Sequence, residues 1–437
     1  MSRKDEVFEY FRRYSDETAE RVNAGIELNR KGHFRVTVKD ASGKSIPGIK
    51  LVAKLKKHDF KFGANLFMLD ELETEKKNSA YKEAFASLFN QATLPIYWSD
   101  LEPTEGKPRY SKNSPKIYRR PALDLCLEFC EANGIFPKAH CLTYFNFTPS
   151  WVDSQDIYDI KRKLETRYAS LAKHYSNKII AWEVINELLC TERIDGKTVF
   201  FKSDDVLEWN FKLAEKYFPN NELVINEASM IWEPLQFNFN RSAYYQIVER
   251  ALKNGARIDT IGTQFHIFGG EKNKISCMYN PRRLYEVLDC YQKLNRPMQI
   301  TEITIPAYSD TAEDEEIQAE LIYNLYKVWF SHPAIEMITY WNLVDGYAAW
   351  AKPGDMSGGE NSLRGGLLRF DLSEKPAYKR LKSLITEEWM TEVETLTDET
   401  GCASFKGFFG EYDIEINGKH HLISLSKANT GEVELII

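Results

Sequence analysis

Short apolar runs alternate with longer segments of helical periodicity through the middle of the chain, from about residue 60 to residue 390. Eight strand–helix units of this size predict the α/β class and a (β/α)8 TIM barrel. An open doubly wound sheet is the alternative, but no Gly-rich phosphate turn follows the first run. The eight runs are FKFGANLF (60–67), ATLPIYW (92–98), IFPKAHCL (135–142), IIAWEVINE (179–187), ELVINEA (222–228), IDTIGTQFHI (258–267), PMQITEITI (297–305) and IEMITYWNL (335–343).

Both ends of the chain have a different pattern. Residues 1–59 predict an amphipathic helix followed by a β-hairpin, because residues 33–60 alternate apolar and polar positions around a Gly/Pro turn. Residues 391–437 alternate in the same way and are few for an independent sandwich. We therefore expect residues 391–437 to pack with residues 33–59 as a small accessory β module beside the 60–390 barrel. A structural brace is the expected role of this module, and glycan binding is the alternative.

The amino-acid composition limits the classes of function that the chain could have. A formal net charge of −7 argues against a nucleic-acid surface, and no apolar stretch is long enough for a membrane span. The first residues lack the apolar core of a signal peptide, so a cytoplasmic location is expected for the chain as written, or secretion if an export signal had been removed. Seven irregularly spaced cysteines predict reduced, mostly buried thiols, and no His/Cys cluster has zinc spacing. The oligomeric state is left open.

Several predicted strands end in polar side chains or a large ring. In a barrel of this kind the catalytic groups lie at the carboxyl ends of the strands. Two carboxylates facing one site are what cleavage of a glycosidic bond requires, one to protonate the leaving oxygen and one to attack the sugar or activate water. The strand-end residues are Asn186, Glu187, Gln264, His266, Glu302 and Trp341.

Five segments resemble family 10 glycoside hydrolases, the xylanase family. WEVINE (182–187) is similar to the acid/base motif W-D-V-V-N-E of that family, and ITEITI (300–305) is similar to its nucleophile motif I-T-E-L-D-I. The other three are TIGTQFH (260–266), TYWNLVDGYAAW (339–350) and GLLRFDLSEKPAY (366–378). The five follow the order of the family over roughly residues 60–385.

The resemblance implies a role for each matched residue. Glu187 would be the general acid/base and Glu302 the nucleophile, which requires a protonated Glu187 and an ionised Glu302. Carbohydrate is the implied partner, with no metal and no organic cofactor. The residues implied or proposed to bind sugar are Asn186, His140, Gln264, His266, Trp341, Trp98, Tyr144 and Trp350.

The sequence departs from the family pattern at three places. The family grips the second sugar with E-N-x-M-K-W, whereas the aligned stretch here contains Leu94, Pro95 and Tyr97. Tyr144 and Phe145 stand where the family has Trp-His, and Thr304 replaces the Asp that follows the nucleophile. We expect a retaining hydrolase, similar to an endo-1,4-β-xylanase acting on xylan or xylo-oligosaccharides. The alternatives are a β-glycosidase for short, branched or aglycone-linked sugars and a non-catalytic carbohydrate-binding protein.

Overall fold

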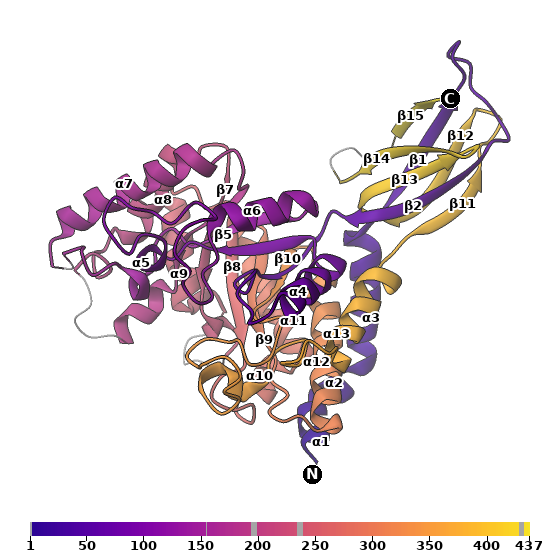
Figure 1. The fold of residues 1–437 in the computed structure, drawn as a ribbon. Helices are drawn as coiled ribbons and strands as arrows, with labels where there is room; N and C mark the ends of the chain where they lie inside the picture. Colours follow the sequence, from indigo (N-terminus) through magenta and orange to yellow (C-terminus); the bar gives the residue numbers. More distant parts are fainter. Residues whose placement is uncertain (1, 154, 194–198, 234–238, 428–431) are drawn as a thin grey trace.

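Eight parallel strands close into a barrel in a computed structural model that describes residues 2–153, 155–193, 199–233, 239–427 and 432–437 (Figure 1). The strand order is β10-β3-β4-β5-β6-β7-β8-β9, so each strand pairs with its sequence neighbour and β10 returns to β3. The strands are β3 (Lys61–Asn65), β4 (Gln91–Pro95), β5 (Phe136–His140), β6 (Ala181–Asn186), β7 (Glu222–Glu227), β8 (Thr260–His266), β9 (Met298–Thr304) and β10 (Ile335–Tyr340). The predicted barrel is confirmed, with one strand in each of the eight apolar runs.

The barrel strands are buried almost throughout, although several of their residues are polar. Every residue of β4, β6, β8 and β9 is buried, as expected for parallel strands that are covered by side chains inside the barrel and by helices outside it. The covering helices are α4 (Glu75–Leu88), α5 (Trp98–Leu101), α6 (Leu123–Ala132), α7 (Ile157–Tyr175), α8 (Val206–Tyr217), α9 (Ala243–Lys253), α10 (Ile275–Met278), α11 (Pro281–Tyr291), α12 (Ala312–Ser331) and α13 (Pro376–Ser383).

Short helical turns connect several of these elements. They are η1 (Phe145–Phe147), η2 (Leu188–Arg193), η3 (Ser229–Ile231), η4 (Phe239–Arg241), η5 (Gln292–Leu294), η6 (Gly359–Leu363) and the π-helical turn η7 (Leu384–Glu388). Three of them, η1, η2 and η3, follow shortly after barrel strands, at the end of the barrel where those strands finish. They therefore shape the mouth of the barrel rather than its wall.

The two ends of the chain build an accessory module of two sheets beside the barrel (Figure 1). One sheet has the order β12-β1-β15 and the other has the order β11-β2-β13-β14. The strands are β1 (Lys31–Lys39), β2 (Lys50–His58), β11 (Glu392–Leu396), β12 (Cys402–Phe408), β13 (Gly410–Ile416), β14 (Lys419–Leu425) and β15 (Glu432–Ile436). The predicted accessory sheets from both ends are thus confirmed.

The predicted hairpin over residues 33–60 is wrong. Strand β1 pairs with β12 and β15, whereas β2 pairs with β11 and β13, so the two strands belong to different sheets. Each strand buries alternate residues, for example Phe34 and Val36 in β1 and Leu51 and Ala53 in β2. Alternation identifies a strand with one buried face, but it does not identify the neighbour to which that strand is hydrogen-bonded.

The N-terminal segment joins the module to the barrel. Three helices, α1 (Arg3–Val7), α2 (Glu9–Arg13) and α3 (Ser15–Asn29), take the place of one predicted helix, with breaks at Phe8 and Tyr14. Helix α3 packs closely on α12, because a side chain at Gly25 would meet the Ser331 carbonyl oxygen at 2.5 Å. Arg30, at the end of α3, donates to the Ile335 carbonyl oxygen (2.6 Å) where β10 begins. Across the described ranges, helices long and apolar enough to cross a bilayer are lacking.

Candidate active site

Side chains from the carboxyl ends of the barrel strands line one cavity of about 890 Å³. Nine of the residues predicted from the sequence lie in its wall: His140, Tyr144, Asn186, Glu187, Gln264, His266, Glu302, Trp341 and Trp350. The structure does not place Trp98 with them. Trp98 begins α5, is buried, packs edge-on against Trp151 and donates its indole N–H to Glu102 (3.1 Å).

Glu187 stands at the point where β6 ends. Its backbone adopts the left-handed conformation, with φ of +52°, which is uncommon for a residue with a side chain and terminates the strand. The Glu187 N–H donates a hydrogen bond to the Asn226 carbonyl oxygen of β7 (3.0 Å). The buried strand therefore ends at the polar pair Asn186–Glu187, and the chain continues into the loop at the mouth of the barrel.

Gln264 connects the two candidate catalytic carboxylates. Its side-chain N–H₂ donates to Glu187 Oε1 (2.8 Å) and to Glu302 Oε1 (3.0 Å). These two oxygens therefore lie at most about 5.8 Å apart, the sum of the two bonds. Carboxyl groups about 5–5.5 Å apart suit direct attack on the sugar, whereas roughly 6.5–9.5 Å leaves room for an intervening water.

Glu302 is buried and surrounded by hydrogen-bond donors. Asn226 donates to its Oε1 (2.9 Å), and the ring nitrogen Nε2 of His266 lies 3.2 Å from its Oε2. Burial nevertheless raises the pKa of Glu302 to about 8, with the Glu183 and Glu187 carboxylates adding to the rise and the His140 charge opposing it. The raised pKa favours the protonated form of Glu302 in the free protein, whereas the family resemblance requires an ionised Glu302 in the reaction.

His266 is oriented by Thr304, the residue that replaces the family Asp. The Thr304 hydroxyl lies 2.9 Å from His266 Nδ1. If the hydroxyl donates to Nδ1, the ring proton is on Nε2 and points at Glu302. Burial lowers the pKa of His266 to about 4, so the ring is neutral at pH 7. Phe268 stacks on the same imidazole, with ring centroids 4.5 Å apart.

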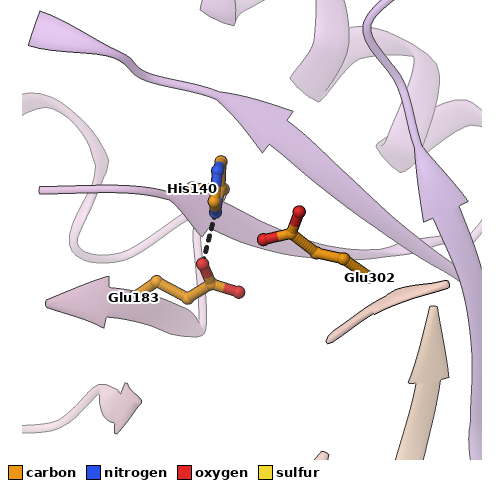
Figure 2. A group of neighbouring side chains, drawn as sticks. All are labelled: His140, Glu183 and Glu302. Atoms are coloured by element: carbon orange, nitrogen blue, oxygen red, sulfur yellow. Dashed lines mark hydrogen bonds and ion pairs between the residues drawn. The ribbon is translucent and has the colours of Figure 1, made fainter. Parts of the chain in front are cut away.

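A buried charged cluster lies under the cavity. Glu183 forms an ion pair with Lys138 (2.7 Å). It also forms a hydrogen bond with His140, and Glu302 points toward the same two residues (Figure 2). Burial opposes ionisation of Glu183, but Lys138 and His140 lower its pKa to about 2. Burial likewise opposes a charged His140, and the Glu183 carboxylate raises the pKa of His140 above its ordinary value.

The cluster has the residue types of a metal site but already contains a cation. One ligand atom each of His140, Glu183 and Glu302 lies within 4.8 Å of the others. The Lys138 ammonium already pairs with the Glu183 carboxylate, and its side chain is fully buried. The ion pair of Lys138 and Glu183 therefore serves to hold the His140 ring in place at the cavity.

Two tyrosines contact the site where the sequence departs from the family pattern. The Tyr144 hydroxyl donates to Glu187 Oε2 (2.6 Å), and the Tyr97 hydroxyl lies 2.9 Å from His140 Nε2. Burial raises the pKa of both phenols, and for Tyr144 the Glu187 carboxylate raises it further. Both hydroxyls therefore stay protonated and can act as hydrogen-bond donors over the working pH range.

The strand-end pattern did not identify several residues that line the cavity. Phe67 follows β3 and packs edge-on against Trp341, with centroids 5.2 Å apart. Arg119 and Arg120 come from the long segment between α5 and α6, and Phe147 ends η1. Loop positions carry no periodic signal, so only the adjacent pair of arginines before Pro121 could have drawn attention to this segment.

Paired carboxylates at the ends of the fourth and seventh strands of a (β/α)8 barrel define the site of the glycoside-hydrolase class. The family model of Glycosyl hydrolase family 10 matches residues 52–384. This chain belongs to glycosyl hydrolase family 10.

Two curated relatives give different contexts for this barrel. Over 408 residues the chain is 28% identical to "Anti-sigma-I factor RsgI6" of Acetivibrio thermocellus, a match that covers 92% of this chain and 46% of the relative. Over 327 residues it is 24% identical to "Beta-1,4-xylanase" of Dictyoglomus thermophilum, covering 70% of this chain and 83% of the relative. The chain thus spans less than half the length of the anti-sigma factor.

Solved structures share the fold. Xylanase 10B from Thermotoga petrophila RKU-1 in complex with xylobiose has a TM-score of 0.59 and 22% identity, covering 76% of this chain and 95% of that chain. TsXylA, an intracellular xylanase of Thermoanaerobacterium saccharolyticum in complex with xylotetraose, has a TM-score of 0.56 and 19% identity, covering 79% and 100%.

Proposed function

We propose that this protein is a retaining glycoside hydrolase that cleaves β-linked glycans of the xylan type. The observation that carries the proposal is the Gln264 side chain, which donates to both Glu187 and Glu302 and holds the nearest oxygens at most about 5.8 Å apart. That separation suits a nucleophile and an acid/base on one glycosidic bond.

The proposed reaction has two steps. Glu302 attacks the anomeric carbon while Glu187 protonates the leaving oxygen, and water activated by Glu187 then releases the sugar from Glu302. The Asn186 Oδ1 accepts from Asn226 (2.8 Å), while no described residue accepts from the Asn186 N–H₂ group, which is therefore free to donate to a sugar hydroxyl. Trp341 forms the apolar floor beside His140, with ring centroids 5.4 Å apart.

Proton placement follows from the electrostatics of the pair. Burial keeps one proton on Glu302 in the free site, whereas the first step requires that proton on Glu187. Positive charge develops on the sugar in the transition state and stabilises the Glu302 anion, assisted by the donors from Asn226, Gln264 and His266. We infer that substrate binding moves the proton from Glu302 to Glu187.

A glycan-binding protein without turnover is the second candidate function. It is favoured by the match to the anti-sigma factor, which extends over 92% of this chain, whereas the match to the Dictyoglomus xylanase extends over 70%. In this reading the barrel would sense a glycan and the same cavity would bind it. If the protein does turn over glycans, the alternative to a xylanase is a β-glycosidase of the same family type that acts on short, branched or aglycone-linked sugars.

The deciding experiment is hydrolysis of aryl β-glycosides and xylo-oligosaccharides by the wild type, Glu302→Gln and Glu187→Ala. Turnover by the wild type that both substitutions abolish supports the hydrolase. Binding of the same sugars without turnover supports the glycan-binding protein. Release of a product with inverted anomeric configuration would contradict the retaining mechanism, and ¹H NMR of the first product measures it.

A further inference from the structure

Arg119 is a buried cation at the wall of the cavity. Arg119 is 5% exposed, and its Nη1 donates to Asn342 Oδ1 (3.1 Å) and to the Tyr347 carbonyl oxygen. Within the described part of the chain, no carboxylate oxygen lies within 4.0 Å of it, and its Nε and Nη2 atoms have no hydrogen-bond partner. A buried guanidinium normally has a paired anion, because removing its charge from water is costly.

Among the described residues, no charged group near Arg119 forms an ion pair with its guanidinium. Glu360 lines the same cavity but accepts from the Asn342 side chain (3.2 Å), so Asn342 separates it from Arg119. Arg120 has its own partner, Asp100, at 2.6 Å. Lys352 and Asp355 also line the cavity, on an exposed loop. Burial lowers the pKa of Arg119, the more distant Glu360 carboxylate opposes this fall, and the neighbouring Arg120 adds to it.

Arg119 faces the side of the cavity opposite Glu187. Its guanidinium lies 5.5 Å from the ring centroid of Phe67, just after β3, and bonds to Asn342, just after β10. Glu187 follows β6, which is four strands from β10 in either direction around the closed barrel. A group bonded to Arg119 therefore belongs to the part of the glycan that stays with Glu302, since Glu187 protonates the part that leaves.

The neighbouring wall of the cavity carries a second arginine, which lies over two stacked aromatic rings. Arg120 lies over the Tyr97 ring (4.2 Å), and Tyr97 stacks on Phe147 with centroids 4.1 Å apart. The Nη2 of Arg120 has no partner among the described residues, so it adds a second donor to this wall. Arginine forks match the two oxygens of a carboxylate.

We propose that the cavity recognises a glycan bearing a carboxylate, such as a uronosyl side group, and that Arg119 binds this carboxylate on the side of the retained sugar. The inference rests on the proposed function for the orientation of the glycan. It specifies the substrate class of the same site, an acidic rather than a neutral glycan.

The test compares three ligands by calorimetric titration of the full-length Glu302→Gln protein, which binds without turnover. They are a xylo-oligosaccharide with one glucuronosyl side group, the methyl ester of that compound, and the unsubstituted oligosaccharide. The ester removes the charge and adds one methyl group. We expect the acid to bind about tenfold more tightly than its ester, as one charge-assisted hydrogen bond permits. Equal affinities for acid and ester overturn the proposal.

Variants then test the assignment to Arg119. In the Glu302→Gln background, Arg119→Met should bring the acid-to-ester ratio close to one, and Arg119→Lys should restore part of it. Lys352→Met is the matched control, a cavity cation on an exposed loop, and should keep the ratio. A ratio that survives Arg119→Met or disappears in Lys352→Met contradicts the role of Arg119. If Arg119→Met does not fold, the comparison of acid with ester still decides the preference for charge.

The outcomes separate this inference from the proposed function. Wild-type hydrolysis of neutral glycans combined with equal binding of acid and ester would retain the hydrolase and refute the acidic substrate class. Preferential binding of the acid without hydrolysis of any glycan would retain the acidic ligand and refute the hydrolase.

Discussion

Replacing Glu302 by Gln should stabilise the protein, and increasingly so as the pH rises. Burial raises the pKa of Glu302 from its ordinary 4.5 to about 8. A carboxyl group with a higher pKa in the folded chain contributes stability below its unfolded pKa and loses it as the pH rises through the folded value. Gln has the same shape, its oxygen can accept the bonds from Asn226 and Gln264, and it does not titrate.

The size of the effect follows from the two pKa values. Each unit of difference corresponds to about 1.4 kcal/mol, so the wild type loses up to about 5 kcal/mol between pH 4.5 and 8, and about 3 kcal/mol by pH 7. The free energy of unfolding of Glu302→Gln should therefore exceed that of the wild type by an amount that increases over this window. These values are ceilings, because the unfolded chain retains some structure.

Urea unfolding and melting temperatures, measured from pH 5 to pH 8.5 for both proteins, test the reasoning. Glu131→Gln is the control, since Glu131 is exposed on the surface, and its difference from the wild type should not change with pH. A difference between Glu302→Gln and the wild type that stays constant or shrinks as the pH rises would show that Glu302 is already ionised in the free protein. The proton placement in the proposed mechanism would then be wrong.

Four further results are expected. Tyr144→Phe should reduce kcat/KM about 10- to 100-fold at unchanged melting temperature, because the 2.6 Å bond to Glu187 is lost while the ring stays; unchanged kcat/KM would contradict this. Lys138→Met should lower the free energy of unfolding by about 3–5 kcal/mol, because Glu183 is left buried without its partner, and Lys138→Met/Glu183→Gln should recover most of it; an unstable double variant would argue against the ion pair as the cause. Trp350→Ala, at an 80% exposed ring, should raise KM for long oligosaccharides more than for aryl monosaccharides, and equal changes would remove its platform role. The pH profile of kcat/KM should decline above about pH 8, where the site loses the Glu302 proton; activity maintained to pH 10 would refute this.

The periodic part of the chain could be predicted from the sequence, together with the residues that periodicity places in space. Buried parallel strands are mostly apolar, so polar side chains at or near their carboxyl ends, such as Glu187, Gln264 and Glu302, were conspicuous. Barrel closure brings those ends together, which is why strand order alone was enough to gather them. Trp98 shows the limit of this reasoning, because it lies beyond its strand end and turns into α5 instead of the cavity.

The sequence by itself determined the barrel, the two carboxylates and the existence of strands at both ends of the chain, because each depends on local periodicity or on a residue at a fixed place in it. Only the tertiary structure decided the partners of β1 and β2, since alternation is the same whichever sheet a strand joins. The tertiary structure also decided that Arg119 is buried without an ion-pair partner and that the pKa of Glu302 is raised. Both depend on burial and on charges that are far apart in the sequence, and these distances are set when the chain folds.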